Sequence, residues 1–269
     1  RLPMDKVAAG INDLVPLLRP DGGQAAAEAI LTTDSVTKQA SYSDEGWSIG
    51  GMAKGAGMLA PGLATMLVVL TTDAVVDSEQ LHDQLASACR RSFERIDSDG
   101  CMSTNDTVIV MSSGASGVRP TPRDFQAALD EICRDLSWQL LGDAEGAAHT
   151  IAIHVEEAAS EEDAVQVGRA IARSNLFKCA VFGHDPNWGR VLAAIGTTTA
   201  DFEPERIDVA FNGVQVCRAG SIGEPRNLVD LSGRDVHLEV NLRNGMHSAT
   251  VWTNDLTYDY VKENAEYST

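Results

Sequence analysis

The sequence lacks any uninterrupted apolar stretch of the roughly 18 to 20 residues that a helix needs to cross a bilayer. It also lacks the apolar core and the small-residue cleavage site of a secretory signal, although its start, RLPMDKVAAG, contains Arg and Lys. With 43% hydrophobic and 22% charged residues among 269, the composition is typical of a globular protein of one or two domains. We therefore expect a cytoplasmic protein with no membrane contact.

Positive charge is also scarce. The chain has 21 Lys and Arg residues against 39 Asp and Glu residues, which gives a formal net charge of -18. Such an excess of negative charge repels phosphate backbones instead of neutralising them. Nucleic acid is therefore excluded as an expected partner.

Paired cysteines are missing as well. The five cysteines are odd in number, widely spaced and free of any Cys-x-x-Cys pair, so the sequence predicts neither a disulfide framework nor a zinc site. We expect them to be buried free thiols. The histidines, among them His149, His154 and His184, do not fall at metal-ligand spacing, and no metal is predicted.

Helical periodicity is present in several segments. Asp77 followed by Gln80 resembles a capping box, Gly142 is placed to end a long amphipathic helix, and Ser160 is placed to cap the next one. Apolar residues at helical spacing predict helices over 3–18, 24–31, 78–96, a long segment ending at 142, and a segment after 160. In the first of these, Met4, Val7, Ile11 and Leu14 or Val15 are expected to share one face.

Strand patterns alternate with these helices. DTVIVMSS predicts a buried strand, and TIAIHVEE alternates like a strand with one buried face. The Asn-Gly pairs at 212–213 and 244–245 each separate two alternating runs, which is typical of a hairpin. Helices, hairpins and the lack of a regular βαβ cycle together predict an α+β fold with layered, mixed sheets.

The segment GGMAKGAGMLAPGLATML leads through small residues to Ala64 and Thr65. Its glycine-rich part matches neither common nucleotide-binding pattern, so a sharp turn is the preferred interpretation. A threonine after a small residue and a tight bend is set for self-cleavage, in which its hydroxyl attacks the carbonyl of Ala64. The freed α-amine, with a pKa of about 7.7 to 8.0, could then accept the hydroxyl proton and activate Thr65 as a nucleophile.

Six sequence blocks carry a resemblance to one family. AILTTD, GGMAKGAGMLAPGLATML, STNDT, DAEG, GHDPNWGR and ENAEYST occur in this order along nearly the whole chain, which resembles the ornithine acetyltransferase (glutamate N-acetyltransferase) family. The resemblance implies cleavage between Ala64 and Thr65 into α and β chains that assemble as a heterotetramer of two α and two β chains. It also implies ping-pong acetyl transfer from N-acetylornithine to glutamate in arginine biosynthesis, with no cofactor, and some members also accept acetyl-CoA.

We expect a layered αββα-type sandwich. The long helix gives way to a new strand near Gly146 to Thr150, which places a boundary between a catalytic domain over residues 1–146 and a smaller C-terminal region over 147–269 that completes the active site. Family members carry a long segment before the point where this chain starts, and that segment holds the Thr-Gly pair of the oxyanion hole. Upstream sequence is therefore expected to be missing here. Without those donors, tetrahedral intermediates would lose a few kcal/mol of stabilisation.

The residues that match the family's substrate contacts are Thr32, Lys54, Thr65, Glu145, Asn264 and Thr269. Lys54 would pair with a substrate carboxylate and Glu145 would hold an amino group. Taken alone, Lys54 would be interpreted as a solvated lysine and Glu145 as a surface acid at a helix end. Asn264 and Thr269 rest on the resemblance, because a chain terminus is usually frayed.

Two other family blocks are interpreted as architecture. HDPNWGR, residues 184–190, suits a turn followed by a helix start, and STNDT, residues 103–107, suits side chains that bond local backbone. Two alternatives to the acetyltransferase stay open. One is an N-terminal-nucleophile amidohydrolase or aminopeptidase, in which water attacks the threonine ester, and the other is an inactive scaffold fragment.

Overall fold

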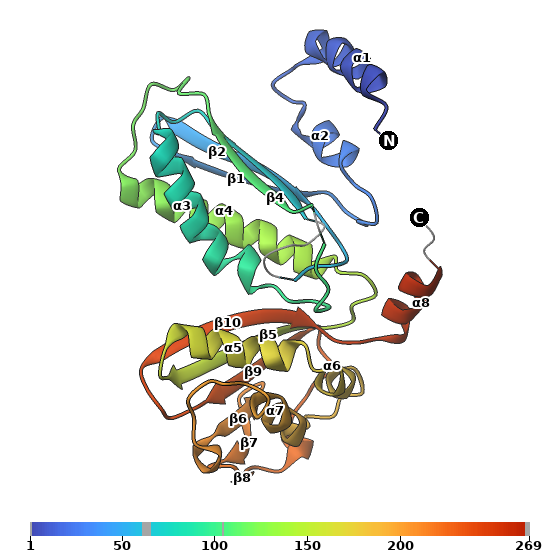
Figure 1. Ribbon diagram of the computed structural model, residues 1–269, viewed down its shortest axis with the longest axis vertical. Coiled ribbons are helices and arrows are strands. Elements are labelled where there is room, and N and C mark those ends of the chain that lie inside the picture. Colours follow the sequence, from blue (N-terminus) through green and yellow to red (C-terminus); the bar gives the residue numbers. More distant parts are fainter. Residues whose placement is uncertain (1, 61–65, 104, 267–269) are drawn as a thin grey trace.

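The computed structural model describes residues 2–60, 66–103 and 105–266. Its frame consists of a four-stranded and a six-stranded sheet, each with helices packed on it (Figure 1). Both sheets combine parallel and antiparallel pairs, which confirms the predicted α+β class with mixed sheets. Within these described ranges, none of the helices has the length and apolar character needed to span a membrane.

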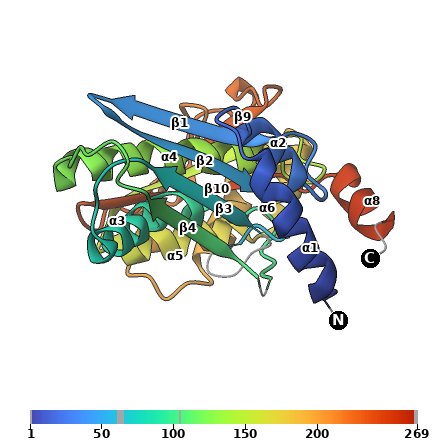
Figure 2. The same cartoon turned by 90° about the horizontal axis from the view of Figure 1, so that it is seen from above.

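The first sheet has the strand order β1-β2-β3-β4, and two helices cover one of its faces (Figure 2). Gly51 lies where the sheet meets these helices, and a Cβ there would come within 2.5 Å of Leu70 and 3.1 Å of Leu136. Glycine at this position therefore allows close packing of helix on sheet. The elements are β1 (Lys38–Asp44), β2 (Trp47–Lys54), β3 (Leu67–Thr72), β4 (Thr107–Ser112), α3 (Ser78–Arg91), the 3-10 turn η2 (Phe93–Arg95) and α4 (Pro122–Gly142).

Strand β4 lies at the edge of this sheet and differs from the prediction of a fully buried strand. Its side chains alternate, and Ile109 and Met111 are 43% and 50% exposed, while Val108 and Val110 pack against the core. A continuous apolar run does not distinguish a strand covered on both faces from one covered on a single face. The helices α3 and α4 cover only the face that carries Val108 and Val110.

The second sheet has the order β10-β5-β9-β6-β7-β8. Its apolar side chains form a core with the helices that follow β5, separate from the cluster under the first sheet. The elements are β5 (Thr150–Ala158), α5 (Glu161–Ala172), α6 (Asn175–Phe182), α7 (Trp188–Ile195), η3 (Pro204–Arg206), β6 (Asp208–Phe211), β7 (Val214–Arg218), β8 (Ser221–Ile222), η4 (Arg226–Leu228), β9 (Asp235–Asn241) and β10 (His247–Asn254).

One of the two predicted hairpins is confirmed and the other is wrong. Strands β6 and β7 pair antiparallel around Asn212 and Gly213, both of which have positive φ. Strands β9 and β10 are not neighbours, because β5 lies between them, parallel to β9 and antiparallel to β10. The connection after β9 crosses the end of β5, where Asn244 N donates to the Glu157 carbonyl at 2.8 Å.

The N-terminal helix prediction is correct in type but not in length or burial. The predicted 3–18 segment is α1 (Met4–Leu14) followed by the 3-10 turn η1 (Val15–Leu17), and the next helix is α2 (Gly23–Ala29). Pro16 has no N–H to continue the α-helix, which explains the change after Leu14. The face with Met4, Ile11 and Leu14 is exposed, so the amphipathic pattern is not used for packing within the described part of the chain.

Helix boundaries were predicted with mixed success. Helix α4 ends at Gly142 as expected, and Ser160 Oγ accepts a 3.0 Å hydrogen bond from Asp163 N at the start of α5. Asp77 does not cap α3 with its side chain and instead pairs with Arg119 at 3.0 Å, so the capping box is wrong. The predicted 78–96 helix also stops at Arg91 and resumes as η2.

The HDPNWGR block has the architectural role expected for it. Asn187 Oδ1 accepts a 3.2 Å bond from Arg190 N and caps α7. The cysteine prediction is correct only in part, because Cys133 and Cys217 are buried free thiols while Cys101 and Cys179 are exposed. The last helix, α8 (Tyr258–Glu266), has no buried residue and projects from the side of the molecule beyond α6 (Figure 1).

Candidate active site

The glycine-rich connection between β2 and β3 is the centre of the candidate site. Lys54 is the last residue of β2 and pairs in register with Leu67, so it lies beside the strand that begins just after the predicted nucleophile. Its side chain is buried, with 4% of the residue exposed. Ala64 and Thr65 lie outside the described residues. The burial of Lys54 contradicts the alternative interpretation of it as an ordinary solvated lysine.

The described residues on either side of 61–65 are held by carboxylates. Met58 N donates to Asp99 at 2.8 Å, and Met66 N donates to Asp106 at 3.0 Å. Burial raises the pKa of Asp106, and the bond from Met66 offsets this only in part. Asp106 belongs to the STNDT block, for which only local bonds were expected, yet its partner is 40 residues away. Hydrogen bonds to Asp99 and Asp106 therefore hold the chain on both sides of the predicted cleavage point.

Glu145 reaches the same connection from the end of α4. Its backbone N donates to the Ala56 carbonyl at 3.0 Å, and its carboxylate lies 2.5 to 2.8 Å from the position that a Cβ on Gly57 would occupy. Asn264 of α8 donates to Glu145 Oε2 at 3.2 Å. Two predicted substrate contacts, Glu145 and Asn264, are thus brought together although 119 residues separate them.

Gly146 explains why helix α8 can lie this close. It has φ +60°, and a Cβ there would collide with the backbone N of Tyr260. Thr257 Oγ1 donates to the Gly146 carbonyl at 2.5 Å and accepts from Tyr260 N at 3.0 Å. Gly146 therefore allows helix α8, which carries Asn264, to pack closely against the backbone that follows Glu145.

A buried ion cluster lies behind these residues. Lys38 is fully buried, and its Nζ is 2.7 Å from Asp34 Oδ1 and 2.5 Å from Asp143 Oδ2. Asp34 Oδ1 also accepts a 2.6 Å bond from Gly55 N, the residue after Lys54. Because Asp143 is two residues before Glu145, the cluster fixes both sides of the candidate site relative to each other.

The buried ion cluster also contacts the backbone of Thr32. Asp34 Oδ2 accepts from Thr32 N at 3.3 Å, which holds the backbone of the exposed Thr32 beside the cluster. Burial acts to raise the pKa of Asp34, but the bonds from Gly55, Lys38 and Thr32 outweigh it, and the net pKa is lowered. Asp34 is therefore held as a carboxylate.

The geometry suits a small charged molecule. Thr32, Lys54, Glu145 and Asn264 lie near one connection, which brings an ammonium and a carboxylate, groups that can orient an amino acid, into the same region. Sequence reasoning missed the groups that position them, namely Asp34, Lys38 and Asp143. Asp34 and Asp143 belong to the blocks AILTTD and DAEG, but neither block indicates a partner for them, and the i,i+4 spacing of Asp34 and Lys38 is informative only in a helix. The predicted contact Thr269 lies outside the described residues.

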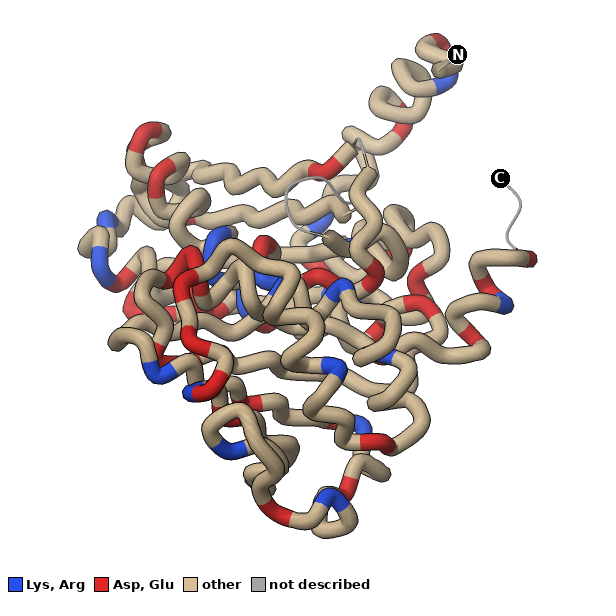
Figure 3. The backbone as a smooth tube through the Cα atoms, turned by 60° about the horizontal axis from the view of Figure 1, so that its bottom comes forward, with Lys and Arg blue, Asp and Glu red and all other residues tan. Residues whose placement is uncertain are grey.

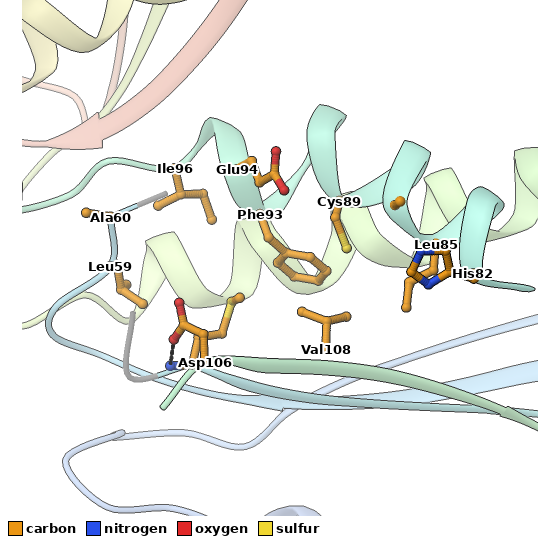
Figure 4. A pocket seen from close by; sticks show the side chains of 12 residues that line it. Leu59, Ala60, His82, Leu85, Cys89, Phe93, Glu94, Ile96, Asp106 and Val108 are labelled. Atoms are coloured by element: carbon orange, nitrogen blue, oxygen red, sulfur yellow. Dashed lines mark hydrogen bonds between the residues drawn. The ribbon is translucent and has the colours of Figure 1, made fainter. Parts of the chain in front are cut away.

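An apolar pocket of about 310 Å³ lies between α3 and the start of β3 and β4 (Figure 4). Ala60 and Met66, which flank the undescribed segment, line it together with Phe93, Val108 and the carboxylate of Asp106. Such walls suit an uncharged group better than a charged amino acid. Within the described ranges, no group of three or more His, Cys, Asp or Glu residues is arranged to hold a metal ion.

Comparison with known proteins identifies relatives over the whole chain. The sequence model of the ArgJ family matches residues 1–269. The chain is 60% identical to the arginine biosynthesis bifunctional protein ArgJ of Thermobifida fusca, over 100% of this chain and 70% of that protein. It is 58% identical to the protein of the same name from Streptomyces avermitilis, over 99% of this chain and 70% of that one. The chain thus spans about 70% of the length of these relatives.

A solved structure has the same fold. The crystal structure of arginine biosynthesis bifunctional protein ArgJ from Bacillus halodurans superposes with a TM-score of 0.69 at 35% identity, and the match covers 75% of this chain and 98% of that chain. Agreement in sequence over the full length and in three-dimensional structure leads to one conclusion: the chain belongs to the ArgJ family.

Proposed function

We propose that this chain is the nucleophile-bearing part of an acetyltransferase that moves an acetyl group from N-acetylornithine to glutamate in arginine biosynthesis. The observation that carries the proposal is the convergence of Thr32, Lys54, Glu145 and Asn264 on the connection that contains Thr65. Membership of the ArgJ family supports it, since the relatives are named arginine biosynthesis bifunctional proteins.

The proposed reaction begins with self-cleavage: Thr65 Oγ attacks the Ala64 carbonyl, the peptide C–N bond breaks to leave an ester, and water hydrolyses that ester to free Thr65 with its α-amine. The Thr65 α-amine then accepts the hydroxyl proton while Oγ attacks the acetyl carbonyl of N-acetylornithine. The amide C–N bond breaks, and ornithine leaves with the proton. The glutamate amine attacks the acetyl ester next, the ester C–O bond breaks, and N-acetylglutamate and the Thr65 hydroxyl are formed.

Lys54 and Glu145 supply the fixed charges for this exchange. We assign the Lys54 ammonium to a substrate carboxylate, the Glu145 carboxylate to a substrate ammonium, and Thr32, Asn264 and Thr269 to polar contacts around them. Donor and acceptor are both amino acids, so one set of orienting groups can serve both halves of a ping-pong reaction.

The proportion of the chain covered by the solved relative supports cleavage at Thr65. The matched structure covers 75% of this chain and is itself covered to 98%, which is the share expected for a β chain that begins at Thr65. The assembly of two α and two β chains, the use of acetyl-CoA, the cytoplasmic location and the division into domains at residues 146 and 147 belong to the proposal.

The test uses intact-mass measurement of the full-length protein, followed by incubation with N-acetylornithine. We expect two fragments that meet at Ala64 and Thr65, and a gain of one acetyl group on the fragment that starts with Thr65. Thr65→Ala should remove both the cleavage and the acetylation. Cleavage that persists in Thr65→Ala would show that another group is the nucleophile, and release of acetate alone in the presence of glutamate would indicate a hydrolase.

A further inference from the structure

The donor and the acceptor of the proposed reaction carry opposite charges on their side chains. N-acetylornithine has a free side-chain ammonium, because its α-amine is acetylated, whereas glutamate has a side-chain carboxylate. The carboxylate of Glu145 attracts the first of these groups and repels the second. Acidic positions are spread widely over the backbone, and the chain has 39 Asp and Glu residues against 21 Lys and Arg residues (Figure 3). The side chain of the acceptor therefore needs a cation of its own close to the candidate site.

Lys178 of α6 is a buried cation whose charge has no counter-ion in contact. Only 4% of the residue is exposed, and its Nζ donates to the Ser98 carbonyl but forms no ion pair with a carboxylate of the described residues. The buried Lys38, in contrast, contacts two carboxylates. Burial lowers the pKa of Lys178, and the charges of Asp99 and Asp97 oppose this effect. A bound carboxylate would stabilise the ammonium further, and the group has three N–H donors to offer.

Lys178 faces a cavity between α6, the segment after η2 and the start of α8. The cavity has a volume of about 290 Å³, which is near the lower end of the range for small-molecule sites. Helices α6 and α8 contact each other beside it, with the rings of Phe182 and Tyr258 5.4 Å apart and edge to face. The lining residues all belong to the described part of the chain and are Asp99, Asn175, Lys178, Leu256 and Tyr260.

The acid in this cavity, Asp99, is satisfied by other donors. Its two oxygens accept from Met58 N at 2.8 Å and from Cys101 N at 3.1 Å. Burial, followed by the charge of Asp99, raises the pKa of Tyr260 to about 12, so its hydroxyl stays protonated and can donate a hydrogen bond. The ammonium of Lys178 is therefore the charge in this cavity that is available to a ligand.

The cavity adjoins the candidate active site through two of its walls. Asp99 binds the backbone of Met58, in the connection that follows β2. The Tyr260 carbonyl accepts from Asn264 Nδ2 at 3.0 Å, and the same amide nitrogen donates to Glu145 Oε2 at 3.2 Å. Asn264 lies about one helical turn beyond Tyr260, which is about 6 Å along the axis. A ligand of amino-acid size can therefore contact both the cavity and the groups around Asn264.

We propose that Lys178 binds the side-chain carboxylate of the glutamate acceptor and so distinguishes the acceptor from the donor. Lys54 can serve the α-carboxylate that both molecules share, and Glu145 the side-chain ammonium of N-acetylornithine. This inference rests on the proposed function, because it requires glutamate to be the acetyl acceptor. Lys178 makes and breaks no covalent bond, and it orients glutamate while the glutamate amine attacks the acetyl ester.

The experiment compares two acceptors in the full-length protein, with N-acetylornithine as donor. Glutamine has nearly the shape of glutamate but an uncharged side chain. We expect Lys178→Met to lower kcat/KM for glutamate by about tenfold or more, the effect of one lost charged hydrogen bond. The kcat/KM values for glutamine and for N-acetylornithine should stay within about twofold of wild type. Lys262→Met removes the same charge from an exposed position of α8 and is the matched control.

The ratio of the two acceptor constants separates recognition from folding, because a loss of folded enzyme lowers both constants equally. A glutamate-to-glutamine ratio in Lys178→Met equal to that of wild type would overturn the inference. A fall in kcat/KM for N-acetylornithine as large as that for glutamate would do the same.

Calorimetry tests the carboxylate site without relying on turnover. It should detect binding of glutamate to wild type and weaker binding to Lys178→Met, and equal binding to both would also overturn the inference. If wild type binds glutamate through Lys178 but takes up no acetyl group from N-acetylornithine, the proposed function fails and the carboxylate site stands.

Discussion

The two halves of this protein differ in where they bury charged groups and in what their outward strand positions carry. The half built on β5 to β10 has an apolar core, and the outward positions of its strand β9 are polar, with Asp235, His237 and Glu239 exposed. Its buried charged or polar groups include Lys178 in α6 and the pair His149–Asp255, which lies just outside β5 and β10. The half built on β1 to β4 buries Lys38 and Lys54 and exposes the apolar Ile109 and Met111 of β4. Strand β9 therefore shows the usual alternation of a one-sided sheet, and β4 departs from it.

We interpret the buried charges of the half built on β1 to β4 as a feature of the candidate site and not as a source of stability. Buried charges need partners and seldom stabilise a fold more than apolar side chains of similar size would. The cluster around Lys38 is explained by what it holds, since Thr32, Lys54 and Glu145 are all one or two residues from its members. The second half has one comparable link, because the buried Lys178 of α6 donates to the Ser98 carbonyl, next to the Asp99 that accepts from Met58 N.

The largest expected effect on stability comes from Lys38→Met. It leaves Asp34 and Asp143 buried without their cation, and we expect the free energy of unfolding to fall by about 3 to 5 kcal/mol in urea titrations. The KM for N-acetylornithine should rise as well, because the Gly55 and Glu145 backbones lose their common anchor. Lys6→Met on the exposed face of α1 is the control and should change neither quantity. An unchanged KM in folded Lys38→Met would remove the link between the cluster and the site.

Leu238→Ala tests the half built on β5 to β10, with an expected loss of stability comparable to that of Lys38→Met. Leu238 is fully buried in the core of the second sheet, and its truncation should lower the free energy of unfolding by about 2 to 5 kcal/mol. At temperatures where the variant stays folded, its KM should match wild type. A rise in KM like that of Lys38→Met would show that any loss of stability loosens the site, and the contrast between the halves would be lost.

Glu145→Gln should separate binding from stability. The substitution keeps the shape but removes the charge, so we expect KM for N-acetylornithine to rise by about tenfold to a hundredfold. The free energy of unfolding should change by less than about 0.5 kcal/mol. Glu263→Gln on α8 is the matched control, since it removes an exposed charge from the helix that carries Asn264. A large loss of stability with normal kinetics would make Glu145 a structural acid.

The smallest effect concerns acid sensitivity. The pKa of Asp34 is lowered in the folded protein, so its carboxylate contributes stability above the unfolded value of 3.8. That contribution is lost as pH falls through the lower folded pKa. The difference in unfolding free energy between wild type and Asp34→Asn should therefore be constant above about pH 5 and shrink below about pH 4. A difference that grows on acidification would contradict the assigned pKa direction.

Local features were predictable from the sequence where the interactions that form them involve one short segment only. Gly142 ends α4, Ser160 caps α5, and Asn212-Gly213 forms a tight turn because each depends on residues within a few positions. The prediction of a hairpin at Asn244-Gly245 was wrong because β5, nearly 90 residues earlier, pairs with both flanking strands. The prediction that β4 is buried was wrong for a related reason, since a run of apolar residues does not show how many faces of a strand are covered.

The sequence alone determined the family resemblance, the mixed α+β class and the location of the predicted cleavage motif, because these depend on the local order and spacing of residues. Tertiary structure decided which charges became buried and what they position. Asp34, Gly55 and Asp143 meet at Lys38 from three separate parts of the chain, and no local pattern encodes that meeting. Long-range packing of strands and helices brings these residues into a space that water does not reach, where each buried charge needs an oppositely charged partner.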